Sequence, residues 1–147
     1  MSVIPKFKRI QPAVITVGAG TPTGDISDLQ HFADGNQYRL QEQAGTPALR
    51  LTIDFVNVRS ILAVYVLGNY VGSTTHCENI EIWNYTTSAW DIIDSFSTRI
   101  CLGAHTAWVF DDSDYINGSN EAIVRLDHPQ SGNTSHDLYI DYIALLY

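Results

Sequence analysis

The chain has 147 residues, enough for one domain with a sizeable hydrophobic core. Its net charge is −8, and all sixteen acidic residues lie beyond residue 10, where only five arginines oppose them. Because phosphate contacts dominate nonspecific affinity for nucleic acids, this acidic body argues against a nucleic-acid partner. The longest apolar run, residues 61–67, is too short to span a bilayer, so no membrane partner is expected.

The first 24 residues differ in composition from the rest of the chain. Both lysines lie here, and a run rich in Gly, Thr and Pro covers residues 18–24. We predict an extended N-terminal arm and linker over residues 1–24, with one strand at 14–17, and a single domain over 25–147. A basic arm could dock on an acidic protein surface, and a solvated charged end is the alternative. The residues expected to make that contact are Lys6, Phe7, Lys8, Arg9 and Ile10.

From residue 26 onward, strand and turn signals alternate along the chain, and no long helical period occurs. The runs at 79–85 and 90–96, joined by a short Thr-Thr-Ser turn, predict a hairpin. The sequence therefore predicts an all-β fold, an antiparallel β-sandwich. The expected strands cover residues 38–42, 49–55, 59–71, 79–85, 90–96, 108–110, 121–128 and 138–146.

Two loops repeat nearly the same sequence sixty residues apart. Residues 72–76 read Gly-Ser-Thr-Thr-His and residues 132–136 read Gly-Asn-Thr-Ser-His. Each is followed by an alternating run, with acids at the matching positions Glu81 and Asp141. A metal site shared by His76 and His136 is one interpretation, but neither loop has an HxH or HxxxH spacing. Hydrogen bonding of each histidine within its loop is the favoured interpretation.

The remaining polar motifs favour a protein without catalytic residues. The chain has no GxSxG nucleophile motif, and Cys77 and Cys101 have no CxxC spacing. No enzyme activity and no cofactor are therefore expected. Asp111, Asp112 and Asp114 could supply oxygen ligands to calcium, although the run lacks the Gly and distal Glu of an EF-hand. A solvated acidic turn is the favoured interpretation of these three residues.

Aromatic residues around the predicted hairpin are the other candidates for a binding surface. Strand parity places Trp83 and Tyr85 on the same face as Glu81, opposite Ile80 and Ile82. Large rings on such a face are enriched at protein interfaces. Ordinary packing and stacking on a sugar are the alternatives. Trp90, which alternates with Ile92, is expected in the core.

A longer resemblance covers residues 28–147. The runs at 70–76, 80–91 and 128–145 resemble a module common in structural proteins of tailed phages and prophages. Such modules look like jelly rolls of the galactose-binding-domain type, a fold that often carries a structural calcium. The resemblance implies a capsid cement or decoration protein that stabilises the phage head by binding across capsid subunits.

The same resemblance implies where the protein acts and what it contacts. Its partners would be the major capsid protein or another virion protein, and self-association into a homotrimer is expected by analogy. The protein would be made in the host cytoplasm and located in the virion. The alternative function is a carbohydrate-binding tail or head-fibre module used in host adsorption, whose partner would be a glycan.

Overall fold

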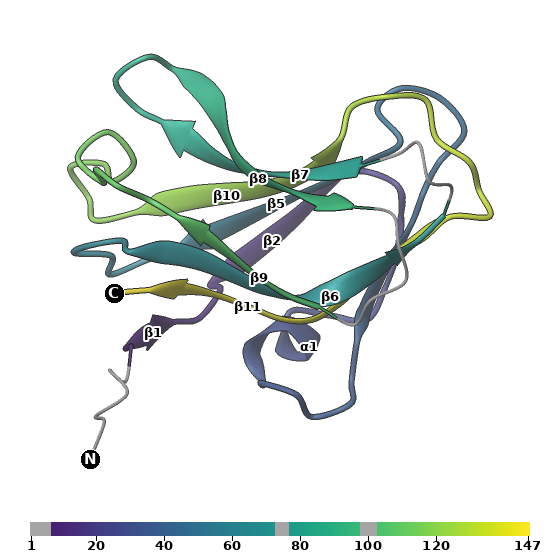
Figure 1. Ribbon diagram of the computed structural model, residues 1–147, viewed down its shortest axis with the longest axis horizontal. Coiled ribbons are helices and arrows are strands. Elements are labelled where there is room, and N and C mark those ends of the chain that lie inside the picture. The colour runs from purple at the N-terminus through teal and green to yellow at the C-terminus, as the bar shows by residue number, and fades with distance from the viewer. Residues whose placement is uncertain (1–6, 73–76, 98–102) are drawn as a thin grey trace.

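The computed structural model describes residues 7–72, 77–97 and 103–147. Two antiparallel sheets pack face to face, and a short helix, α1 (Ser27–Gln30), lies against the outer side of one of them (Figure 1). The predicted all-β sandwich is confirmed. No helix among the described residues is long and apolar enough to cross a membrane.

The first sheet, sheet A, has the order β3-β4-β11-β6-β9, and β1 pairs with β11 beside this path. Its strands are β1 (Arg9–Ile10), β3 (Thr21–Thr23), β4 (Tyr38–Gln41), β6 (Ala63–Val71), β9 (Gly103–Trp108) and β11 (Asp137–Leu146). The second, sheet B, has the order β2-β5-β10-β7-β8. Its strands are β2 (Val14–Ala19), β5 (Leu49–Phe55), β7 (Cys77–Asn84), β8 (Ala89–Ser97) and β10 (Ala122–His128).

The core lies between the two sheets and follows from period-two alternation. In β5, residues Leu49, Leu51, Ile53 and Phe55 are fully buried, whereas the residues between them are half-buried. Each apolar side chain of this size stabilises the fold by roughly 1.5–3 kcal/mol when fully buried. The core therefore fixes the strand register, because a slip of one residue would turn these side chains outward.

The N-terminal segment forms strands of the sandwich itself. β1 pairs with the last residues of β11, β2 is an edge strand of sheet B, and β3 pairs with β4. Residues 9–23, which composition assigns to an arm and linker, therefore contribute to both sheets. Pro22 is tolerated in β3 because this strand lies at the edge of sheet A.

Two other local expectations differ from the structure, and the short helix α1 has no counterpart among the expected elements. Residues 59–62 precede β6, and Ile61 N–H donates to Asp112 Oδ2 at 2.7 Å instead of joining a sheet. Strand β9 begins at Gly103, before the apolar residues 108–110 that indicated a strand there. Finally, Leu29 lies in α1 and is fully buried against the sandwich.

The strands that follow the two similar loops begin at the same end of the sandwich. β7 begins directly after His76 and β11 directly after His136, as the repeated pattern predicts. Val71 at the end of β6 pairs with Asp137 at the start of β11, which brings the second loop beside the start of the first. Gly132 in the second loop lies against residues 43–48: its N–H donates to Gly45 C=O at 3.0 Å.

Gly132→Ala should destabilise the protein by several kcal/mol. A Cβ at Gly132 would collide with Gln43 O and would lie 2.6 Å from Ala48 Cβ, so the backbone of one loop must move. Gly118→Ala is the matched control, because a Cβ there meets no atom within 4 Å. Urea denaturation measures both variants, and equal stability of the two would contradict this account of the loop.

Candidate functional site

The outer face of sheet B presents side chains in rows that cross several strands. The register aligns Glu81 with Arg125 and with Ile92, and it aligns Trp83 with Trp90. Ile123 pairs with Asp54, which in turn pairs with Val14 on the edge strand. These residues alternate with buried core residues along each strand, so they share the outer face.

Two tryptophans on neighbouring strands form the aromatic part of this face. The rings of Trp83 and Trp90 meet edge to face with centroids 5.3 Å apart, and both residues are half-buried. The expectation that Trp90 lies in the core is wrong, because its strand partner is the outward Trp83 and Ile92 on the same side is 62% exposed. The turn between β7 and β8 sets the register that pairs Trp90 with Trp83, and this register places Trp90 and Ile92 on the outer face although both are apolar.

A row of paired charges adjoins the tryptophans. Arg125 Nε lies 2.6 Å from Glu81 Oε2, and the guanidinium carbon lies 4.2 Å from the centroid of the Trp90 ring. Arg125 Nη2 is also 3.8 Å from Asp127, whose other oxygen accepts from Arg50 Nε at 2.7 Å. The side chains of Arg125, Glu81 and Asp127 are only 14%, 7% and 3% exposed. The row is therefore closely packed, and its geometry is held by mutual pairing.

A pocket of about 170 Å³ lies near the other side of the same face. Val14, Asp54, Glu121 and Ile123 are among its lining residues. Burial raises the pKa of Asp54, and the nearby charge of Glu121 raises it further. Burial likewise raises the pKa of Tyr85, and the charges of Glu121 and Asp54 add to the effect. Carboxylates can accept hydrogen bonds from a polar ligand, and a phenol can both donate and accept them.

The acidic turn after β9 is hydrogen-bonded to the turn between β7 and β8. Asp114 accepts from Thr86 Oγ1 at 2.6 Å, and Tyr85 N–H donates to Asp114 C=O at 2.8 Å. Asp112 accepts from Ile61, while Asp111 accepts from Ser113 N–H at 3.0 Å. The three candidate calcium ligands thus accept hydrogen bonds from three different groups. Calcium binding by them, the less favoured interpretation, is untested.

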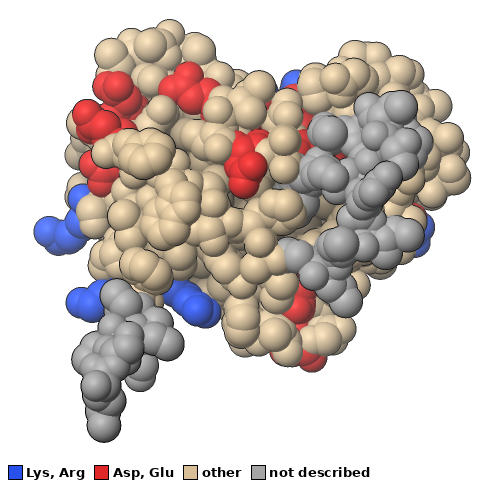
Figure 2. Space-filling model, viewed as in Figure 1, with Lys and Arg blue, Asp and Glu red and all other residues tan. Residues whose placement is uncertain are grey.

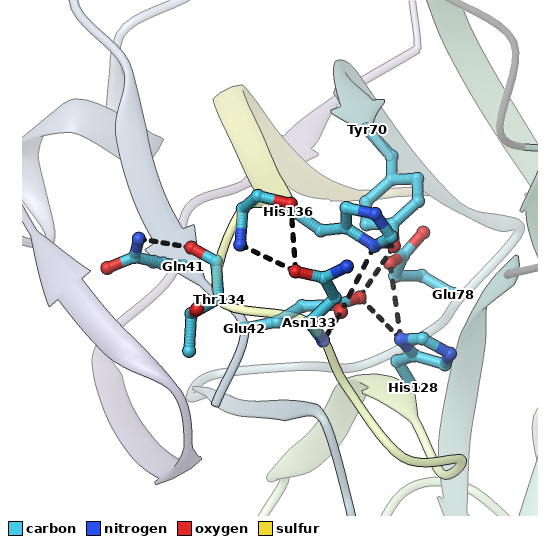
Figure 3. Close-up of polar contacts among 9 residues, drawn as sticks. Gln41, Glu42, Tyr70, Glu78, His128, Asn133, Thr134 and His136 are labelled. Atoms are coloured by element: carbon cyan, nitrogen blue, oxygen red, sulfur yellow. Dashed lines mark hydrogen bonds and ion pairs between the residues drawn. The ribbon is translucent and has the colours of Figure 1, made fainter. Parts of the chain in front are cut away.

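The second histidine loop contributes to a buried polar network between the sheets (Figure 3). Glu42, directly after β4, accepts from Tyr70 Oη and is joined to His128 Nδ1, both at 2.6 Å. Its other oxygen accepts from Asn133 N–H at 2.8 Å and lies 3.4 Å from His136 Nδ1. Burial acts to raise the pKa of Glu42, but these hydrogen bonds outweigh it and the pKa is lowered.

His136 lies 3.0 Å from Tyr70 Oη, a partner outside its own loop, whereas the favoured interpretation was hydrogen bonding within the loop. His76, Cys101 and the side chain of Cys77 lie outside the described residues, so a metal site shared by His76 and His136, the less favoured interpretation, is untested. Nothing in the sequence marks Glu42 or Glu78 as members of a buried cluster. Glu42 comes at the end of an alternating run, where a polar residue is common, so its position gives no signal of burial.

The expected contact residues of the arm lie against the protein's own sheet A. Phe7 meets Trp108 edge to face at 6.3 Å, and Lys8 exchanges backbone hydrogen bonds with Tyr147. The Arg9 guanidinium lies over the rings of Phe32 and Tyr142, and Ile10 packs against the core. Lys6 lies outside the described residues. A partner-binding role for this segment remains a prediction.

Solved structures of carbohydrate-binding modules have the same fold. A family 32 module from C. perfringens NanJ, in complex with galactose, superposes with a TM-score of 0.57 at 8% identity, covering 91% of this chain and 93% of that one. A family 29 module gives 0.59 at 11% identity, covering 96% and 88%. Another family 29 module, complexed with mannohexaose, gives 0.55 at 12% identity, covering 98% and 93%. The chain is therefore a jelly roll.

In sequence, no protein-family model and no curated protein matches the chain. These structural neighbours are carbohydrate-binding modules, two of them in complex with a sugar. At 8–12% identity the likeness concerns the fold alone. The function must therefore be argued from the residues of this chain.

Arg125→Met should cost about 3 kcal/mol of stability, because it leaves Glu81 as a poorly solvated carboxylate without its partner, whereas Asp127 keeps Arg50. Arg39→Met is the matched control: its pair with Asp137 at 2.8 Å is more open, with Arg39 39% exposed. This control should lose much less. Chemical denaturation of both variants checks the prediction, and a loss at Arg125 no greater than at Arg39 would contradict a packed charge row.

Proposed function

We propose that the protein is a non-catalytic carbohydrate-binding module whose ligand lies on the outer face of sheet B. The observation that carries the proposal is the strip formed by Trp83 and Trp90, on the same face of sheet B as the acidic pocket. Aromatic rings offer an apolar surface for the C–H face of a pyranose, and polar groups beside them orient its hydroxyls. The shared fold with sugar-binding modules supports the same reading.

The charges of the strip favour an uncharged glycan. Asp54 and Glu121 line the pocket, and the neighbouring arginines Arg50 and Arg125 are already paired with carboxylates. An anionic sugar would meet these two acids in the pocket, and their repulsion disfavours its binding. The pocket is smaller than the roughly 300–1,000 Å³ typical of sites that enclose a drug-sized ligand. It suits the edge of one sugar ring, with the rest of an oligosaccharide lying along the tryptophans.

Binding to neutral glycans should fall about five- to tenfold in Trp83→Ala and in Trp90→Ala, because each loses a stacking surface worth roughly 1–1.5 kcal/mol. A glycan array selects the ligand, and titration calorimetry measures the affinity of each variant. Trp108→Ala is the matched control: this tryptophan is 48% exposed on β9, in sheet A, and its loss should leave affinity unchanged.

Two outcomes would sink the proposal. One is the absence of glycan binding by the wild-type protein across neutral and charged sugars. The other is an equal loss in Trp108→Ala and in the two strip variants. Circular dichroism of each variant separates a lost contact from a lost fold.

Adhesion to other proteins is a second candidate function, favoured by a separate apolar surface. Phe110 is 99% exposed, and Phe7, Leu62, Trp108 and Tyr147 are 38–48% exposed. The backbone joins Val109 to Leu62 and Lys8 to Tyr147, so these residues are neighbours. Figure 2, seen from the side on which β9 runs in front, shows uncharged surface between acidic groups and the basic N-terminal region. Exposed apolar surface on an edge strand favours association.

The predicted homotrimer and capsid contact would use this surface. Wild-type protein should sediment as an oligomer that dissociates on dilution, and the double variant Trp108→Ser, Phe110→Ser should sediment as a monomer. Val14→Ser, at an exposed position on β2, serves as the control. A wild-type chain that stays monomeric at high concentration would show the oligomer prediction to be wrong.

A further inference from the structure

Three buried ligand groups from distant parts of the chain converge between the sheets. Glu42 follows β4, Glu78 lies in β7 and His128 ends β10 (Figure 3). Each offers one ligand atom, and these atoms all lie within 4.8 Å of one another. All three side chains are 0% exposed. Among the residues that the structure describes, no other group of three His, Cys, Asp or Glu side chains converges in this way.

Glu78 is the unexplained member of this cluster. Both of its carboxylate oxygens are buried and have no hydrogen-bond partner among the described residues, and Oε1 lies 3.9 Å from His128 Nδ1. Leaving a buried polar group without a partner costs about 1–3 kcal/mol, and more for a charged group. A carboxylate that is fully buried and has no donor to either oxygen would be compensated by a positive partner.

We propose that Glu42, Glu78 and His128 bind a divalent transition-metal cation of the zinc type. Imidazole nitrogen and carboxylate oxygen are the ligands that such ions take, at about 2.0–2.2 Å. Ligand atoms at that distance in a tetrahedral site lie roughly 3.4 Å apart. The spacings in the cluster bracket this value: 2.6 Å from His128 Nδ1 to Glu42 and 3.9 Å to Glu78 Oε1. Small side-chain rotations reach the required geometry.

The ligand set also decides against other ions. Calcium takes six to eight oxygen ligands and magnesium keeps several waters in an octahedral site, whereas this cluster is fully buried and includes an imidazole. Two carboxylates would balance a divalent cation, so the filled site carries no net charge in the core. Around it, Asn133 N–H and Tyr70 Oη bind Glu42 and fix its orientation. Such surrounding hydrogen bonds tune metal affinity in known sites.

The test uses the full chain, stripped of metal with a chelator, and Zn²⁺ alone as the probe. After dialysis well below the melting temperature, the wild-type protein should hold about one Zn²⁺ per chain and should melt at a higher temperature than in chelator. Glu78→Gln should bind none at this site and should show no zinc-dependent shift. Glutamine keeps the shape of the side chain and removes the charge, so the metal-free variant should melt at or above the temperature of the metal-free wild type.

Asp141→Asn is the matched control, because Asp141 in β11 is also a buried carboxylate with an unpartnered oxygen. This variant should bind Zn²⁺ like the wild type. Co²⁺ gives a second readout, a visible absorption band in the wild type that is absent from Glu78→Gln. Absence of zinc binding by the wild type, or equal binding by Glu78→Gln, would overturn the proposal.

Discussion

The carboxylate of Glu42 is the constraint on which one end of the sandwich depends. It joins Tyr70 in sheet A to His128 in sheet B and accepts a backbone N–H from the loop before β11. A buried carboxylate is tolerated only when such donors replace water, and here three of them do. These contacts link the two sheets at the end of the sandwich where the hydrophobic core ends and the loops begin. The position of the second histidine loop therefore follows from one side chain.

Strand β10 connects this buried network with the outer face of sheet B. His128 points inward to Glu42, whereas Asp127 and Arg125 take part in the outer charge row. Successive side chains of a strand point to opposite faces, so the inner residues of β10 do not contact its outer residues directly. A substitution on one face therefore leaves the contacts of the other face in place. The pairing of Arg125 with Glu81 and its place over Trp90 hold the tryptophan in one orientation. A ligand that stacks there would meet a surface already ordered, which lowers the entropy cost of binding.

Much of the fold could be predicted because its core obeys period two. β5 and the hairpin of β7 and β8 have strong alternation, and both were expected where they lie. β9 could not be located because Gly103 to Ala107 offer few large apolar side chains. Residues 9–23 were expected to form an arm and linker, but they form strands β1, β2 and β3, which pair with β11, β5 and β4. Pairing between residues so far apart in sequence cannot be predicted from composition. The jelly-roll resemblance was correct for the fold, while the capsid role, the trimer and the virion location stay predictions.

The binding residues were harder to predict for a related reason. Trp83 was placed on the correct face by parity, but Trp90 was not, because the register of a hairpin depends on its turn. Glu42, Glu78 and His128 lie on strands far apart in sequence, so no local spacing marks them as a group.

The two similar loops show the limit of local pattern most clearly. Both precede strands at the same end of the fold, so the repeat correctly indicated equivalent places in the architecture. The second loop contacts the core through two residues. Asn133 N–H donates to Glu42 Oε2, and His136 Nδ1 lies 3.4 Å from the same oxygen. The ring of His136 also packs edge to face on Tyr70 at 5.9 Å, which restricts the phenol that donates to Glu42. A histidine in such a position acts by orienting a carboxylate. The buried carboxylate, and not the repeated histidine, is the group around which this end of the protein is organised.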